Sequence, residues 1–139
     1  MLEPTPTPDI SEGSFTLLKP ISLDDPSYGA TDFEWIWSGN LPPGYGFEVR
    51  AWRSGEQPAG VHNAVLDNQN GRVEHLGGNR YRLTTNIREA ASVKGRSGEY
   101  LWTVLLVKVS PEYENLKIQA EPARFRFETG GTSGGGKDD

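Results

Sequence analysis

Apolar and polar residues alternate with a period of two along much of the chain. In residues 33–37, Phe33, Trp35 and Trp37 fall on every second position, and residues 47–52 repeat the alternation. Successive side chains of a β-strand point to opposite faces, so this period predicts strands with one buried face. Further segments with this pattern lie at residues 80–83, 99–109 and 123–128, and residues 14–18 make a first strand.

Turn-forming residues separate the strands. The stretch NLPPGYG, residues 40–46, supplies proline and glycine between the first two long strands. Two short, weak strands are predicted at residues 61–66 and 72–76, joined by the hairpin dipeptide Asn70-Gly71.

One short helix is predicted over residues 86–93. Asn86 caps its first turn there, and Glu89 reaches back toward the cap. About seven short strands with turns between them predict an all-β fold, a sandwich or barrel of antiparallel sheets.

The two ends of the chain differ from its middle. Residues 2–9, LEPTPTPD, alternate proline with threonine or glutamate, which is typical of an extended spacer. Residues 129–139, TGGTSGGGKDD, are rich in glycine and serine. The sequence therefore predicts a Pro/Thr-rich linker over residues 1–14, one domain over residues 15–128 and a disordered tail, as in a module excised from a longer protein.

Charge and composition narrow the class of partners. The chain has 19 acidic and 14 basic residues and a net charge of -5, so neither nucleic acid nor an anionic membrane surface is expected as a partner. It has no cysteine, which excludes disulfides, thiolate metal sites and cysteine nucleophiles. No apolar run is long enough to predict membrane insertion of this segment, and the first residues do not resemble a leader, although a leader could have been cut away. No cofactor is predicted.

Four segments resemble an established kind of β-domain. The stretches FEWIW, FEVRAW, GEYLWTVLLV and ARFRFE are similar to strands B, C, F and G of a fibronectin type III or immunoglobulin-like domain. On that mapping Trp35 is similar to the core tryptophan of strand B, and Tyr100, Trp102 and Val104 match strand F. The resemblance covers residues 15–128, although the stretch between strands C and E is longer and richer in glycine than usual.

The resemblance implies an antiparallel two-sheet sandwich, which is the fold that we predict. It also implies a setting, because such domains, linked by Pro/Thr-rich spacers, commonly serve as spacers, adhesive units or binding modules in bacterial surface and secreted proteins.

The phase of the strands divides the large side chains between an interior and an outer face. The expected interior consists of Phe33, Trp35, Trp37, Phe47, Val49, Tyr100, Trp102, Val104, Phe125 and Phe127. Trp52 has the opposite phase and is expected to point outward from the sheet that contains strands C, F and G. Strand F is apolar on both of its faces, so something is expected to cover that outer face.

Two explanations of the apolar outer face remain open. Either arginines or residues 54–79 fold over it, or it is an interface with a neighbouring domain, a second copy of the chain or a ligand. In the second case the binding residues are Trp52, Arg50, Leu105, Val107, Arg124 and Arg126.

A second candidate surface is one end of the sandwich. The B–C loop, residues 38–46, and the F–G loop, residues 110–122, are expected at the same pole, where Tyr45 and Tyr113 offer contact area for a protein or a sugar. The alternative is that Tyr45 packs back on the core.

Catalytic and metal-binding chemistry finds little support. His62 and His75 are the only histidines, and neither has an obvious nucleophile beside it. Carboxylate and amide side chains that could ligate calcium occur in two clusters. Their spacing does not match an EF-hand loop, and they are interpreted as turn residues. These clusters are Asp24 with Asp25, and Asp67 with Asn68 and Asn70. No metal is predicted, and the chain is not expected to be an enzyme.

We therefore predict a non-catalytic interaction or spacer module of an extracytoplasmic multidomain protein, secreted or on the cell surface. Its partner would be a protein or an adjacent domain of the same chain. The alternative is a carbohydrate-binding module for a polysaccharide, which would need two or more aromatic rings exposed in one plane. A small hydrolase, with His62 or His75 beside a carboxylate in a cleft, is the third and weakest reading.

Overall fold

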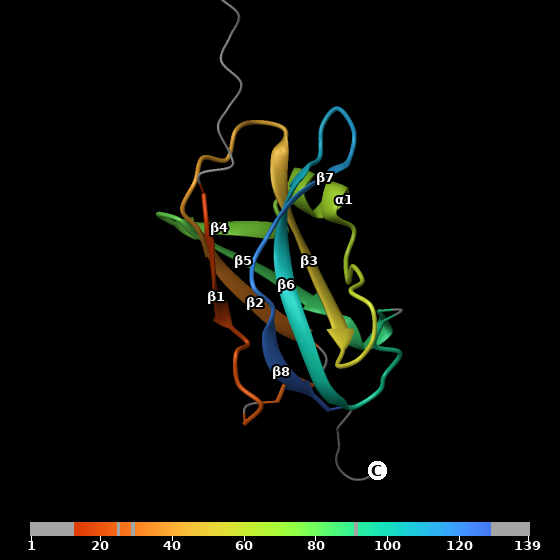
Figure 1. The fold of residues 1–139 in the computed structure, drawn as a ribbon. Coiled ribbons are helices and arrows are strands. Elements are labelled where there is room, and N and C mark those ends of the chain that lie inside the picture. Colours follow the sequence, from red (N-terminus) through yellow and green to blue (C-terminus); the bar gives the residue numbers. More distant parts are fainter. Residues whose placement is uncertain (1–12, 25, 29, 91, 129–139) are drawn as a thin grey trace, which may run out of the picture.

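Two four-stranded antiparallel sheets pack face to face in the computed structural model, which describes residues 13–24, 26–28, 30–90 and 92–128 (Figure 1). The first sheet has the order β1-β2-β5-β4, with β1 (Phe15–Lys19), β2 (Ala30–Trp37), β5 (Arg80–Asn86) and β4 (Val73–Gly77). The second contains β3 (Tyr45–Arg53), β6 (Gly98–Lys108), β7 (Glu114–Gln119) and β8 (Ala123–Phe127). The predicted two-sheet antiparallel sandwich is confirmed. The predicted tail and nearly all of the predicted linker lie outside the described residues.

Strands β7 and β8 both pair with β6 and follow one another along it. Leu105 of β6 lies opposite Gln119 of β7, and Trp102 of β6 lies opposite Ala123 of β8. The predicted F–G loop over residues 110–122 is therefore wrong, because residues 114–119 are a strand. The alternation in that stretch is broken by a register shift, next to which Lys117 has a φ of 64°, and a bulge of this kind hides a strand from a period-two search.

The interior lies between the two sheets and is rich in aromatic rings. The ten side chains assigned to it from the sequence all belong to one buried cluster. Phe33 contacts Trp102 with ring centroids 4.9 Å apart, and Phe47 contacts Tyr81 at 4.6 Å. The indole N–H of Trp102 donates to the carbonyl oxygen of Pro20 at 2.6 Å. Each such ring buries on the order of 150–250 Å², so this cluster supplies most of the apolar burial that holds the sheets together.

Residues 61–66 do not form the predicted strand. Helix α1 (Ala64–Gln69) takes their place, with Asn63 as its N-cap, whose side chain accepts a hydrogen bond from the backbone N–H of Leu66. The helix ends at Gln69 with Asn70 as its C-cap, and Gly71 follows with a φ of 84°. The Asn70-Gly71 pair thus ends a helix and does not join a hairpin, since a left-handed glycine serves either purpose.

The predicted helix over residues 86–93 is a single 3-10 turn, η1 (Ile87–Glu89). Asn86 caps it as expected, accepting from the backbone N–H of Arg88 at 3.0 Å. The turn stops at Ala90, whose ψ of 145° is extended. A helix this short is not stable by itself, and the fully buried Ile87 fixes this one to the sandwich.

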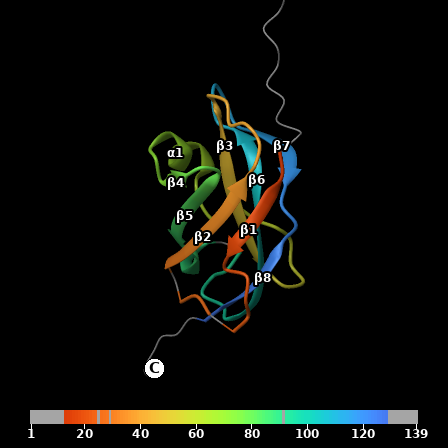
Figure 2. The same ribbon diagram turned by 90° about the vertical axis from the view of Figure 1, so that its left-hand side faces the viewer.

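The described chain enters and leaves the sandwich at opposite poles (Figures 1 and 2). Ser14, before β1, accepts a backbone hydrogen bond from Ser38 in the β2–β3 loop. Glu128, after β8, donates to Ser27 near the start of β2, at the other pole. Neither described helix has the length and apolar character needed to cross a lipid bilayer.

Candidate functional site

The outer face of the β3-β6 pair is buried. Trp52 is only 7% exposed, and Leu105 and Val107 are at 1% and 0%. Leu105, Val107 and Val109 form a second apolar cluster, and Val65 of α1 packs against it. Trp52 lies outside the main core cluster, in agreement with its predicted outward direction, but the expectation that it is exposed is wrong. At Leu105 and Val107 the cover comes from within residues 54–79, the first of the two explanations left open by the sequence.

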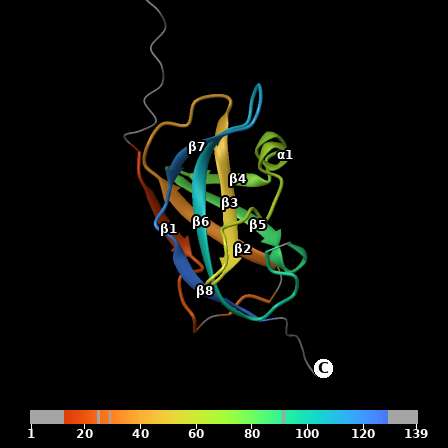
Figure 3. The same ribbon diagram turned by 45° about the vertical axis from the view of Figure 1, so that its right-hand side comes forward.

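Residues 59–69, which we call the strap, also close the free edge of β3 (Figure 3). The backbone N–H of Phe47 donates to the Asn68 side chain at 3.0 Å, and that of Val49 donates to Nε2 of His62 at 2.9 Å. The backbone N–H of Ala51 donates to the carbonyl oxygen of Ala59 at 2.9 Å. Unpaired strand edges invite association with other chains, so the strap removes this edge as a docking surface.

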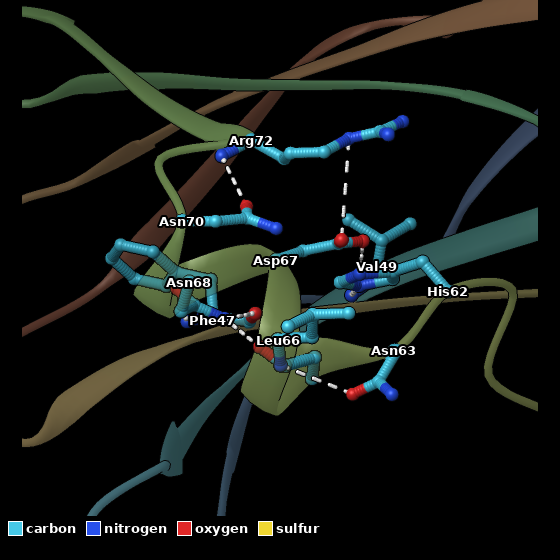
Figure 4. Close-up of polar contacts among 10 residues, drawn as sticks. Phe47, Val49, His62, Asn63, Leu66, Asp67, Asn68, Asn70 and Arg72 are labelled. Atoms are coloured by element: carbon cyan, nitrogen blue, oxygen red, sulfur yellow. Dashed lines mark hydrogen bonds and ion pairs between the residues drawn. The ribbon is translucent and has the colours of Figure 1, made fainter.

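His62 is the buried centre of the strap (Figure 4). Its side chain is 2% exposed, and its Nδ1 lies 2.9 Å from Oδ2 of Asp67. Because Nε2 accepts a hydrogen bond from Val49, the ring hydrogen is on Nδ1 and is donated to Asp67. Burial lowers the pKa of His62 below its ordinary value, and the neighbouring Asp67 opposes this shift only in part.

This histidine–aspartate pair is not a catalytic dyad. A general base needs a free nitrogen lone pair directed at its substrate, and Nε2 of His62 is occupied by a backbone N–H. His75 is exposed, stacks on Tyr81 at 4.7 Å, and lies 2.6 Å from the carbonyl oxygen of Gly78. Both histidines thus have structural contacts.

The oxygen ligands of the second cluster considered for calcium are engaged elsewhere. Asp67 binds His62, and the Asn70 side chain accepts from the backbone N–H of Arg72. The Asn68 side chain binds both the N–H and the carbonyl oxygen of Phe47. Across the residues that the structure describes, no group of three or more histidine, cysteine or acidic residues is arranged to hold a metal ion. Asp25 lies outside the described residues.

The arginines predicted for the outer face each pair with a carboxylate. Arg50 forms an ion pair with Glu48 at 3.1 Å. Arg124 pairs with Glu99 at 2.9 Å, and Arg126 with Glu128 at 3.1 Å. They form local ion pairs and do not frame an exposed tryptophan.

Tyr113 and Tyr45 lie at the pole where the β2–β3 and β6–β7 loops meet. The Tyr113 hydroxyl donates to the buried carboxylate of Glu48, and Arg50 contacts the same hydroxyl at 3.4 Å. Burial, together with the hydrogen bond to Glu48, raises the pKa of Tyr113. Tyr45 is half-buried. The Tyr113 hydroxyl thus anchors its loop to β3 at this pole, while the residue stays 43% exposed.

The outer face of the other sheet is open and charged. The Glu34 side chain is only 7% exposed, although it lies on this face, because three cationic side chains surround it. Lys19 lies 3.3 Å from its carboxylate, Arg80 2.8 Å and Arg82 3.9 Å. Arg80 and Lys19 are more than half exposed, so each keeps N–H groups that face solvent.

Two cavities open on this face and share Lys19 as a wall. One has a volume of about 380 Å³ and is lined by residues that include Pro26, Tyr28 and Asp32. The other, of about 480 Å³, is lined by Leu18, Lys19, Glu34, Ile36 and Arg80. We call the two together the Lys19 groove, the candidate functional site.

A register shift between β1 and β2 builds the middle of the Lys19 groove. Leu17 pairs with Trp35, but Lys19 pairs with Glu34, so Leu18 is an extra residue between them. Such an irregularity re-aims the following side chain. It places the Lys19 ammonium group beside Glu34, on the outer face.

The Lys19 groove is not among the surfaces predicted from the sequence. No role was predicted for Lys19, Tyr28, Asp32 or Arg80. The available signal was a tyrosine in a proline-rich turn next to a strand with two outward carboxylates, which is weak. The shift that brings Lys19 to Glu34 depends on pairing between strands and has no local signature.

No family model matches the chain, and no curated protein matches it. The site is therefore interpreted from its own geometry.

Proposed function

We propose that the chain is a non-catalytic interaction or spacer module of an extracytoplasmic multidomain protein, with a protein or an adjacent domain of the same chain as its partner. The observation that carries the proposal is the position of the two ends of the described domain at opposite poles. Chain termini of a domain often lie close together. With its ends at opposite poles, this domain would instead lengthen a row of linked domains by the long dimension of the sandwich.

The strand order supports the immunoglobulin-like part of the proposal. With β7 and β8 taken as one interrupted strand, the orders β1-β2-β5-β4 and β3-β6-β7 correspond to the ABED and CFG sheets of a constant-type immunoglobulin domain. The extracytoplasmic setting rests on the resemblance to such domains and on the composition of residues 2–9.

The non-catalytic part is supported by the contacts of the reactive side chains. Both nitrogens of His62 are occupied, and His75 lies on a tyrosine ring away from the groove. Asp32 in the groove accepts a hydrogen bond from Thr84, and Glu34 is neutralised by cations. These contacts suit recognition and stability more than proton transfer.

Replacement of the domain in its parent protein tests the proposal. An unrelated β-sandwich of similar length with ends at opposite poles should restore the parent's surface exposure if this domain is a spacer. If it is an interaction module, the replacement should fail, and substitutions on its surface should reproduce the failure. A deletion with no effect on exposure or partner binding, or turnover of hydrolase substrates by the purified chain, would overturn the proposal.

One observation favours the second candidate, a carbohydrate-binding module. The exposed Tyr28 ring lines a cavity bordered by Lys19 and Asp32. A single exposed tyrosine differs from the two coplanar rings expected from the sequence for such a module. The candidate sugar-binding surface therefore lies on the sheet opposite Trp52.

A further inference from the structure

The Lys19 groove is long enough for a chain-like ligand. Its lining follows the outer side of β2 from Ala30 in one cavity to Ile36 in the other. A strand rises about 3.3 Å per residue, so the groove extends for roughly 20 Å. A linear ligand with several similar units would fill it.

The charges along the groove are balanced. Asp32 supplies an acceptor, while Lys19 and Arg80 supply donors. The Glu34 carboxylate adds a negative charge but is only 7% exposed and already lies against Lys19 and Arg80. An anionic ligand would meet the two carboxylates, and a cationic ligand would meet the ammonium and guanidinium groups, which disfavours both. A hydroxyl group donates and accepts at once, so a neutral ligand with many hydroxyl groups fits Asp32, Lys19 and Arg80.

Tyr28 provides the apolar surface that such a ligand needs. Tyr28 is 57% exposed, and its backbone is held in place because Arg88 donates to its carbonyl oxygen at 3.0 Å. Pro26 lies in the same cavity, and Ile36 lies at the far end of the groove. Binding sites for small ligands typically combine aromatic and apolar walls with a few polar groups that fix orientation.

The Lys19 groove runs along the face of the sheet and reaches its edge, because Lys19 ends the edge strand β1 and residues 30–33 of β2 have no partner in β1. A peptide that binds as an added strand uses the backbone groups of an open edge, so the titration includes a peptide probe. The polar side chains along the groove favour a ligand whose own polar groups are hydroxyls.

We propose that the Lys19 groove binds a neutral, linear oligosaccharide, with one sugar ring packed on Tyr28 and hydroxyl groups along the ligand bonded to Asp32, Lys19 and Arg80. This inference rests on the proposed function as a non-catalytic binding module. It specifies the ligand class of the second candidate, the carbohydrate-binding module.

Titration of the full chain with defined glycans tests the inference. The neutral probes are cellohexaose, maltohexaose, xylohexaose and chitohexaose, and the charged probes are hexagalacturonate and a chitosan hexamer. Calorimetry should detect binding of at least one neutral probe, and amide NMR shifts should be confined to the surroundings of Lys19, Tyr28, Asp32 and Arg80. The peptide LEPTPTPD serves as the peptide probe.

Variants of the exposed rings and side chains decide whether the groove is the site. Tyr28→Ala should weaken the binding by at least about tenfold, whereas Tyr28→Phe should keep most of it. Leu66→Ala is the matched control, because Leu66 is 53% exposed on α1 and far from the groove in the fold. Thermal unfolding of each variant establishes that it is folded.

Four results would overturn the inference: no neutral probe binds at 10 mM, only a charged probe binds, the peptide binds in the groove while the glycans do not, or Tyr28→Ala binds as well as the unaltered chain. None of these results would touch the proposed module function, which the domain replacement tests separately.

Discussion

The outer faces of the two sheets are treated in opposite ways. On the β3-β6 side, apolar residues such as Leu105 and Val107 lie outward and are sealed by the strap. On the β2-β5 side, Glu34, Arg80 and Arg82 lie outward, and the two arginines pair with the buried Glu34 carboxylate while staying in contact with solvent. Strand β6 is apolar on both faces, which predicted that another surface covers its outer face. The covering surface is the strap of the same chain. The face that stays open to solvent is the one with ordinary period-two alternation.

The largest contrast between the two faces should come from a buried charge. Val107→Asp places an unpaired carboxylate beneath the strap, and we expect the free energy of unfolding to fall by about 3–5 kcal/mol. The matched change on the open face, Ile36→Asp, should cost about 1 kcal/mol or less, because the new charge reaches water and lies near Arg80. Urea unfolding of both variants measures the difference. Equal losses would mean that the strap does not shield its face.

The next effect concerns the side chain that fastens the strap. His62→Ala leaves the N–H of Val49 and the carboxylate of Asp67 without their partners, and we expect a loss of about 2–3 kcal/mol. His75→Ala, at the exposed histidine, should cost less than about 1 kcal/mol. Hydrogen exchange at the Val49 amide should accelerate in the first variant only. Unchanged protection there would contradict the role of His62 at the β3 edge.

Two buried carboxylates, one on each outer face, give a smaller contrast. Glu48→Gln weakens the contacts of Tyr113 and of Arg50, whose side chain is 26% exposed, and should cost about 1–2 kcal/mol. Glu34→Gln should cost only about 0.5 kcal/mol, since Lys19 and Arg80 are more than half exposed and water can replace the carboxylate. Chemical denaturation at low and high salt checks both values. A larger loss at Glu34 would reverse the distinction between the sealed and the open face.

Much of the sandwich could be predicted from the sequence because burial and strand period coincide there. Phe33, Trp35 and Trp37 recur at every second residue, and all three are fully buried. The strap could not be predicted in the same way. Its contacts join residues far apart in the sequence, such as the Asn68 side chain and the backbone of Phe47. Side-chain pairing with a strand edge leaves no periodic trace.

The candidate site was harder to predict than the core for a related reason. Trp52 and Leu105 were conspicuous because they are apolar at positions where polar residues were expected. Their apolar character reflects burial within the chain and not an exposed binding surface. The Lys19 groove depends on one extra residue, Leu18, in the pairing of β1 with β2. It also depends on Arg80 lying across the sheet from Lys19, on the far side of β2. Neither feature can be read from local composition.

The smallest predicted effect is a pH dependence that arises from His62 in the strap. Burial lowers the pKa of His62 in the folded state, whereas an unfolded chain takes up this proton near pH 6.5. The unfolded state therefore binds more protons as the pH falls through 6.5, and the free energy of unfolding decreases until the lower folded pKa is reached.

Asp67 and Glu48 face the ring and favour its charged form, while Arg72 and burial oppose it. We expect a loss of about 1 kcal/mol or less between pH 7.5 and pH 5.5, measured as a shift in the urea midpoint. His62→Gln should flatten this dependence, because its amide can still accept from Val49 and donate to Asp67 without titrating. An equal slope in that variant would assign the dependence to other groups and leave the strap insensitive to acid.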